Sequence, residues 1–203
     1  MMLVEQTTVP GTALPVAQFK DHLRLGTGFA DDEVQDTLLE TYLRAAMAAI
    51  EARTGKILLS RSFTWTLTAW RDLAAQALPV APVAAITELK IVDRLGGEEI
   101  VATTRYTLER DLHRPRLVAS GLVLPLVPVG GEIVISFDAG FGAAWGDLPA
   151  DLAQAVLMLA TQYYENRGAG DSAIGAGDLP RPVQMLIQRY RTVRLFGGGG
   201  GGR

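Results

Sequence analysis

The 203-residue chain contains no cysteine and only two histidines, His22 and His113. The absence of cysteine excludes disulfides, zinc ribbons, iron–sulfur clusters and thiol nucleophiles. A histidine-rich metal site or a serine triad would have to use one of the two histidines. The longest apolar run, Leu122–Val129, contains two prolines and is too short to cross a bilayer. The N-terminal residues lack the pattern of a secretory signal. We therefore expect no membrane association and synthesis in the cytoplasm.

Common catalytic motifs are also missing. The sequence has neither a Gly-x-Ser-x-Gly elbow nor a His-Glu-x-x-His pair. Gly168–Gly175 is rich in glycine but lacks the Gly-Lys-Ser/Thr ending of a phosphate-binding loop, so it is interpreted as a flexible connection. Asp111 and His113 have no third metal ligand nearby, and Asp31–Glu33 is better explained by helix capping than by paired-carboxylate chemistry. We expect no catalytic residue, no cofactor and no metal.

The charges are distributed unevenly although the total is only −3. The last 25 residues carry five Arg and no acid, so residues 1–178 carry a net charge of −8. A basic C-terminal arm on an acidic body suggests that the arm meets an acidic or carbonyl-rich partner. The alternative is that the five Arg only solvate a terminal helix.

The end of the chain combines cations with apolar side chains. Val193 and Leu195 alternate with Arg194, and Phe196 precedes six glycines that cannot fold by themselves. We interpret residues 192–203 as a flexible arm that becomes ordered on a partner. Leu195 and Phe196 would be its apolar anchors, and Arg189, Arg191 and Arg194 would pair with carboxylates. A frayed terminus is the alternative.

Hydrophobic periodicity divides the chain into helical flanks and a β-rich middle. Helical spacing of apolar residues, with Pro or acidic residues at the starts and Gly at several ends, predicts helices over 14–25, 32–54, 149–167 and 181–191. Alternating patterns predict strands over 62–70, 86–93, 99–102, 106–108, 116–118 and 132–138. The expected fold is α+β: N- and C-terminal helices pack together in one domain, 1–191, with a mostly antiparallel sheet inserted at 60–140.

The order of several short motifs resembles a known family. They are Glu51–Gly55, Trp65 with Trp70, Leu78–Val83, Arg105–Leu108, Ile133–Gly142, Leu148–Leu152 and Tyr163–Arg167. Together they resemble the head–tail connector (adaptor) proteins of long-tailed phages. The resemblance is strongest to the versions in gene transfer agents and related prophages of alphaproteobacteria, and it covers about residues 16–191.

This resemblance implies a structural role. Such adaptors form a ring, typically of twelve copies, under the portal at the head–tail junction of a phage-like particle assembled in the bacterial cytoplasm. The ring extends the DNA channel towards a stopper or tail-terminator protein, and the C-terminal segment reaches the portal. On this sequence the portal-binding arm would be Arg189, Arg191, Arg194, Leu195 and Phe196. The six-glycine ending departs from the family's pattern.

Physical considerations agree with a conduit for double-stranded DNA. An acidic body lets the duplex pass without strong phosphate binding. Ring closure needs a head-to-tail interface, for which Tyr42, Tyr164 and Trp145 are candidate anchors, although they suit a core equally well. Two other classes stay open: a small nucleic-acid-binding module that uses the basic C-terminus, and a small hydrolase, against which the shortage of His and Cys argues.

Overall fold

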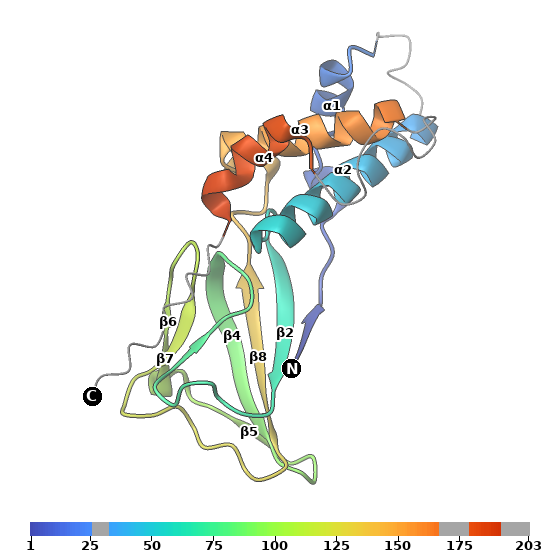
Figure 1. Cartoon of the computed structure of the whole chain (residues 1–203). Helices are drawn as coiled ribbons and strands as arrows, with labels where there is room; N and C mark the ends of the chain where they lie inside the picture. Colours follow the sequence, from blue (N-terminus) through green and yellow to red (C-terminus); the bar gives the residue numbers. More distant parts are fainter. Residues whose placement is uncertain (26–32, 167–178, 192–203) are drawn as a thin grey trace, which may run out of the picture.

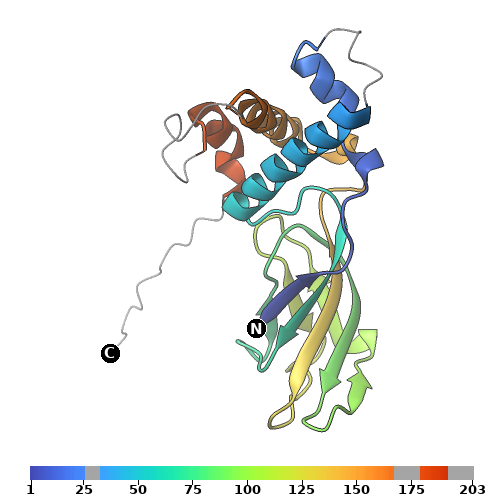
Figure 2. The same cartoon turned by 90° about the vertical axis from the view of Figure 1, so that its right-hand side faces the viewer.

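The computed structural model describes residues 1–25, 33–166 and 179–191. The fold is α+β, as the sequence predicts: helices from both ends of the chain form a layer above a β-rich lobe (Figure 1). The same division is seen after a quarter turn (Figure 2). We call the helices the helical layer, and we call residues 61–139 together with the N-terminal strand Met2–Glu5 the β lobe. The elements of the helical layer are α1 (Val16–His22), α2 (Glu33–Thr54), α3 (Ala150–Glu165), α4 (Arg181–Ile187) and the 3-10 turn η6 (Gln188–Tyr190).

The β lobe contains two antiparallel sheets. The five-stranded sheet has the order β1-β2-β8-β4-β5, and the three-stranded sheet has the order β3-β7-β6. The strands are β1 (Met2–Glu5), β2 (Arg61–Leu67), β3 (Ala75–Ala77), β4 (Val83–Val92), β5 (Glu98–Ile100), β6 (Tyr106–Glu109), β7 (Arg116–Ala119) and β8 (Glu132–Ala139). The N-terminal strand β1 therefore joins the sheet that is otherwise inserted between helices.

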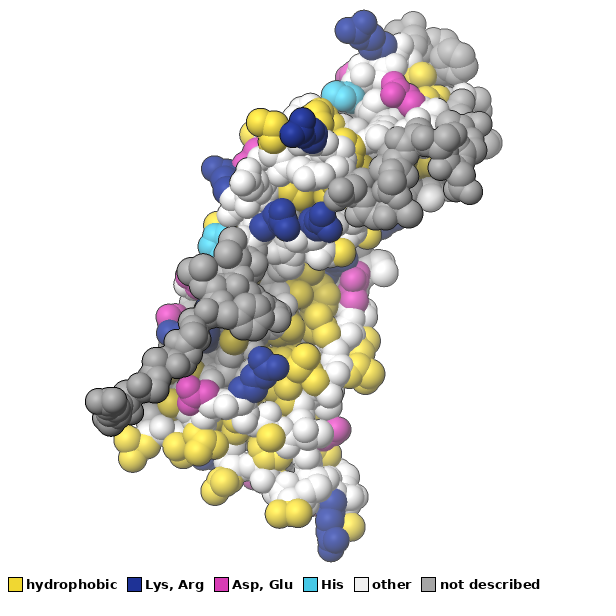
Figure 3. All heavy atoms as spheres, viewed as in Figure 1, with side chains coloured by type: hydrophobic (Ala, Val, Ile, Leu, Met, Phe, Trp, Pro, Cys, Tyr) yellow, Lys and Arg dark blue, Asp and Glu magenta, His cyan; other side chains and the backbone are white. Residues whose placement is uncertain are grey.

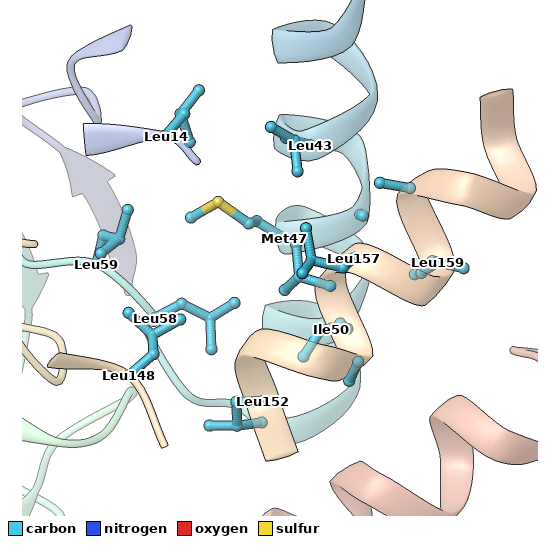
Figure 4. Close-up of a cluster of buried hydrophobic side chains, with 14 of the residues drawn as sticks. Leu14, Leu43, Met47, Ile50, Leu58, Leu59, Leu148, Leu152, Leu157 and Leu159 are labelled. Atoms are coloured by element: carbon cyan, nitrogen blue, oxygen red, sulfur yellow. The ribbon is translucent and has the colours of Figure 1, made fainter. Parts of the chain in front are cut away.

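Each part has its own core. In the helical layer, aliphatic side chains of α2 and α3 meet those of the segments that lead to and from the lobe (Figure 4). Its labelled members are Leu14, Leu43, Met47, Ile50, Leu58, Leu59, Leu148, Leu152, Leu157 and Leu159. In the lobe, the alternation along β8 buries Ile133, Ile135 and Phe137 against the other strands. The hydrophobic pattern thus changes period where the chain passes from one core to the other.

An ion-pair network joins the two parts. The Glu51 carboxylate, at the end of α2, accepts hydrogen bonds from the Leu58 N–H at 2.8 Å and from the Arg61 guanidinium at 2.6 Å. Arg61 also pairs with Glu5 of β1 at 2.9 Å. The chain also packs closely where it leaves the lobe after β8. Gly140 has φ +138°, and a Cβ at this position would lie 2.5 Å from the Ser60 backbone, so only glycine fits there. These contacts fix the lobe on the helical layer.

The predicted boundaries differ from the structure at several ends. The predicted helix 14–25 is shorter, at Val16–His22, and 181–191 is an α-helix to Ile187 followed by the 3-10 turn. The predicted strand 62–70 ends at Leu67, because Trp70 turns aside and its Nε1–H donates to the Pro125 carbonyl at 2.7 Å. Strands β1 and β3 were not predicted. The predicted flexible connection, Gly168–Gly175, and the predicted flexible arm, 192–203, lie outside the described residues.

Candidate docking surface at the C-terminal helix

The residues predicted to form the portal-binding arm begin within η6, at Arg189. Arg189 and Arg191 are described and exposed, whereas Arg194, Leu195 and Phe196 lie outside the described residues. The structure therefore shows the base of the predicted arm.

The base of the arm is held by local packing of α4 on α3. Pro180 precedes the first turn of α4, and Val183 and Ile187 are buried in the helical core. Tyr190 ends the same apolar face and is only 2% exposed. Its ring meets Phe141 edge-on, at 6.2 Å between ring centroids. The chain is thus fixed through residue 190.

One acidic side chain organises the polar groups at this point. Asp151, in the first turn of α3, accepts a hydrogen bond from the Tyr190 hydroxyl at 2.8 Å and one from the Leu152 N–H at 3.0 Å. The Arg189 Nε lies 2.8 Å from the other Asp151 oxygen, and the Arg189 guanidinium also donates to the Tyr190 hydroxyl. Its charge lies 4.7 Å from the centre of the Tyr190 ring. Burial, followed by the hydrogen bond to Asp151, raises the pKa of Tyr190.

This network changes the role expected for Arg189. The hydrogen bond to Tyr190 raises the pKa of Arg189, and the side chain is engaged with Asp151 inside the chain while it stays 68% exposed. Arg189 therefore positions the base of the arm. Arg191 follows the network and has an exposed side chain, so it is better placed to meet a partner.

The outer face of α4 carries a surface that sequence reasoning missed. Met185 is 76% exposed between two open hollows of about 360 and 380 Å³. The second hollow is lined by Arg181, Gln184, Met185, Gln188 and Arg191. An apolar side chain bordered by cations and amides is typical of a docking site for a mixed apolar and acidic segment. The sequence does contain one indication of this surface: Met185 does not share the apolar face formed by Val183, Ile187 and Tyr190. Figure 3 shows basic side chains on the helical layer.

The three predicted ring-interface anchors all take part in packing within the chain. Tyr42 and Tyr164 contact each other edge-on at 6.0 Å between α2 and α3, and Trp145 is partly buried against the helical core. Their remaining exposed edges are available to a neighbour, so their role in a ring stays a prediction.

The residues considered as metal ligands do not form a metal site in the described part of the chain. Asp111 accepts hydrogen bonds from the Arg114 and His113 N–H groups at 2.6 and 2.7 Å, which lower its pKa and close a charged loop. No three His, Cys, Asp or Glu side chains gather as metal ligands among residues 1–25, 33–166 and 179–191. None of the helices within these ranges is long and apolar enough to cross a membrane.

Comparison with solved structures finds strong similarity over nearly the whole chain. A chain in the neck of an empty GTA particle, computed with C6 symmetry, is 57% identical with a TM-score of 0.88; the match covers 98% of this chain and 99% of that one. A chain in the virion of a native gene transfer agent (GTA) particle is 56% identical (TM-score 0.85), with the same coverage. A third, in the neck of a native GTA particle computed with C12 symmetry, is 52% identical (TM-score 0.82), also over 98% and 99%. No protein-family model and no curated protein matches.

Proposed function

The chain belongs to the family of gene transfer agent neck proteins, and on that basis we propose that it is the head–tail adaptor of a phage-like particle. In this role it forms a ring under the portal, extends the DNA channel and joins the capsid to the tail. The observation that carries the proposal is the match, above 50% identity and over 98% of this chain, to chains of particle necks. A fragmentary or fold-only likeness would not support a shared position in a particle.

Ring formation is supported by the symmetry of the related particles. The necks that contain the relatives were computed with C6 and C12 symmetry, which repeats a chain around an axis. We propose a ring of twelve copies. A stopper or tail-terminator protein would bind its tail side, and assembly would take place in the bacterial cytoplasm before the particle is complete.

Portal binding is assigned to the C-terminal surface. The face of α4 offers Met185 as an apolar contact and Arg181 and Arg191 as exposed cations. The Asp151 network holds the chain up to Tyr190, so the following residues leave from a fixed point. Arg194, Leu195 and Phe196 would then extend the contact onto the portal. A fixed base lowers the entropy lost when the arm becomes ordered on its partner.

The proposed channel does not bind DNA specifically. Residues 1–178 carry a net charge of −8, which disfavours the phosphate contacts that would hold a duplex in place. The relatives are components of particle necks and virions, which favours a structural protein without enzymatic activity.

Truncation tests the portal contact. Tyr190 is buried in the helical core and should be kept, so the truncated chain should end at Arg191. A chain ending at Arg191 should fold normally but bind much more weakly in pull-down with purified portal rings, because it keeps only the contacts at the base of the arm. A chain ending at Phe196, which lacks only the glycines and Arg203, is the matched control and should bind like the full chain. Equal binding by both truncated chains would refute the assignment of the arm.

Nucleic-acid binding is the second candidate, favoured by three exposed cations between the start of α4 and the end of η6: Arg181, Arg189 and Arg191. Titration with duplex DNA at low and moderate salt separates the two functions. An adaptor should bind weakly at both salt concentrations. Tight binding with a steep salt dependence would instead indicate that these arginines contact phosphates.

A further inference from the structure

One edge of the five-stranded sheet is unusually apolar and exposed. Strand β1 pairs with β2 on one side, and no other strand of the described residues pairs with its outer edge. Met2 is 61%, Leu3 37% and Val4 39% exposed, so side chains on both faces of the strand meet solvent. Its one charge, Glu5, is already paired with Arg61. Soluble proteins usually protect an edge strand with several charges, proline or a bulge. Strand β1 has no proline, no bulge and no charged side chain other than Glu5.

The opposite edge of the sheet is protected. Strand β5 has only three residues, two of them glutamates, and Glu98 pairs with Lys90 of β4 at 3.2 Å. A short and charged strand is a poor template for another strand. The two edges are therefore not equivalent, and only β1 presents an edge suited to an additional chain.

A second apolar surface is formed by the segment between β7 and β8. Leu122 is 93%, Leu126 86% and Val129 96% exposed. The segment is nevertheless anchored: Leu124 is buried and its N–H donates to the Leu73 carbonyl at 2.7 Å, and the Pro125 carbonyl accepts the Trp70 indole N–H. The exposed side chains therefore project from a fixed backbone. Several large apolar side chains exposed on one anchored segment favour an interaction site.

The two surfaces lie in different parts of the lobe. In Figure 1, β1 is the dark blue strand to the right of β2, whereas the yellow segment that follows β7 starts at the lower left and runs along the bottom of the lobe to β8. In Figure 2, where the right-hand side of Figure 1 faces the viewer, β1 crosses the front of the lobe. Figure 3 shows hydrophobic side chains gathered along the lower left of the lobe.

We infer that a second copy of this chain covers these surfaces, with the β1 edge of one copy packed against the β7–β8 segment of the next. A closed ring requires a head-to-tail interface, in which each copy contributes two different surfaces. The C6 and C12 symmetry of the related necks calls for such an arrangement, and the two apolar flanks supply it. The inference rests on the proposed ring and adds the residues that close it.

The absence of cysteine makes the inference directly testable by cross-linking. The full-length variant Met2→Cys/Leu126→Cys is produced in place of the natural chain, and purified particles are treated with a short bis-maleimide. The expected result is that most of the chain moves from the monomer band into a ladder of its own multiples. Met2→Cys/Leu95→Cys is the matched control, because Leu95 is 85% exposed in the β4–β5 turn but lies outside the proposed contact. It should give no ladder.

The single variants separate the possible arrangements. Met2→Cys alone and Leu126→Cys alone should stay monomeric, because like residues do not meet in a head-to-tail contact. Cross-linked dimers of either single variant would overturn the inference. So would a product in which Leu126→Cys is cross-linked to a different protein of the particle.

The same experiment separates this inference from the proposed function. Particles that contain the double variant without any ladder would overturn the interface but leave the adaptor function intact. Normal tailed particles that lack the protein, although the variant folds in solution with an unchanged melting temperature, would overturn both.

Discussion

Removing the Tyr190 hydroxyl tests how the base of the arm is held. The variant Tyr190→Phe keeps the buried ring and its contact with Phe141, and loses the 2.8 Å hydrogen bond to Asp151. Asp151 keeps Arg189 and the Leu152 N–H, so no buried acceptor is left without a partner. A hydrogen bond to a charged group contributes about 1.5–3 kcal/mol, and we expect a loss at the low end, about 1.5 kcal/mol. For a chain of this length the melting temperature should fall by about 3–6 °C.

A double-mutant cycle with Asp151→Ala measures the coupling between the two side chains. Each change removes the contact between Tyr190 and Asp151, so the double variant should lose little more stability in urea unfolding than Asp151→Ala alone. The coupling energy should therefore be at least about 1 kcal/mol. Tyr163→Phe is the control: Tyr163 is half-buried on α3, its hydroxyl has no partner within the described residues, and the change should stay within about 0.5 kcal/mol.

The cycle also bears on portal binding. If the base must be ordered for docking, Tyr190→Phe should weaken binding to portal rings by up to about tenfold, which corresponds to 1.4 kcal/mol. Additive effects of the two substitutions, within about 0.3–0.5 kcal/mol, would refute the reasoning, because they would show that the two side chains do not act together.

Three further predictions concern the junction between the helical layer and the lobe. Lys56 is fully buried, its Nζ has no hydrogen-bond partner in the described part of the chain, and burial lowers its pKa. Lys56→Met should therefore stabilise the fold by about 2 kcal/mol and raise the melting temperature by about 4–8 °C. A melting temperature below that of the natural chain would contradict this. Glu51→Ala should cost about 3 kcal/mol in urea unfolding because it leaves the Arg61 side chain, which is only 11% exposed, without its closest partner. A loss below about 1 kcal/mol would show that the pair is not important. Burial raises the pKa of Glu51 above 4.5, so the folded protein binds the proton of this carboxyl group more tightly than the unfolded chain does. The resulting stability is present below pH 4.5 and is lost as pH rises through the raised pKa. This pH dependence of the free energy of unfolding should be absent from Glu51→Gln.

The two-part fold is readable from the sequence because the hydrophobic period changes along the chain. The predicted helix 32–54 matches α2 closely, since acidic residues and Gly55 mark its ends. Strand β1 was missed because Met2–Glu5 is exposed on both faces and shows no alternation of buried and exposed positions. Strand β3 has only three residues, too few for a pattern.

The candidate site was predictable only in part. Charge asymmetry pointed to Arg189 and Arg191, because the distribution of arginines is a property of the sequence itself. The partnership between Asp151 and Tyr190 links residues 39 positions apart, and it depends on how α4 packs on α3. No local pattern carries that information. The engagement of Arg189 with Asp151 inside the chain follows from the same packing.

The central claim is that this chain joins the head of the particle to its tail. Electron microscopy of particles from cells that lack only this gene tests it most directly, with the gene restored as the control. We expect DNA-filled heads and separate tails that do not join, and normal tailed particles after restoration. Tailed particles at the normal frequency without the gene would contradict it.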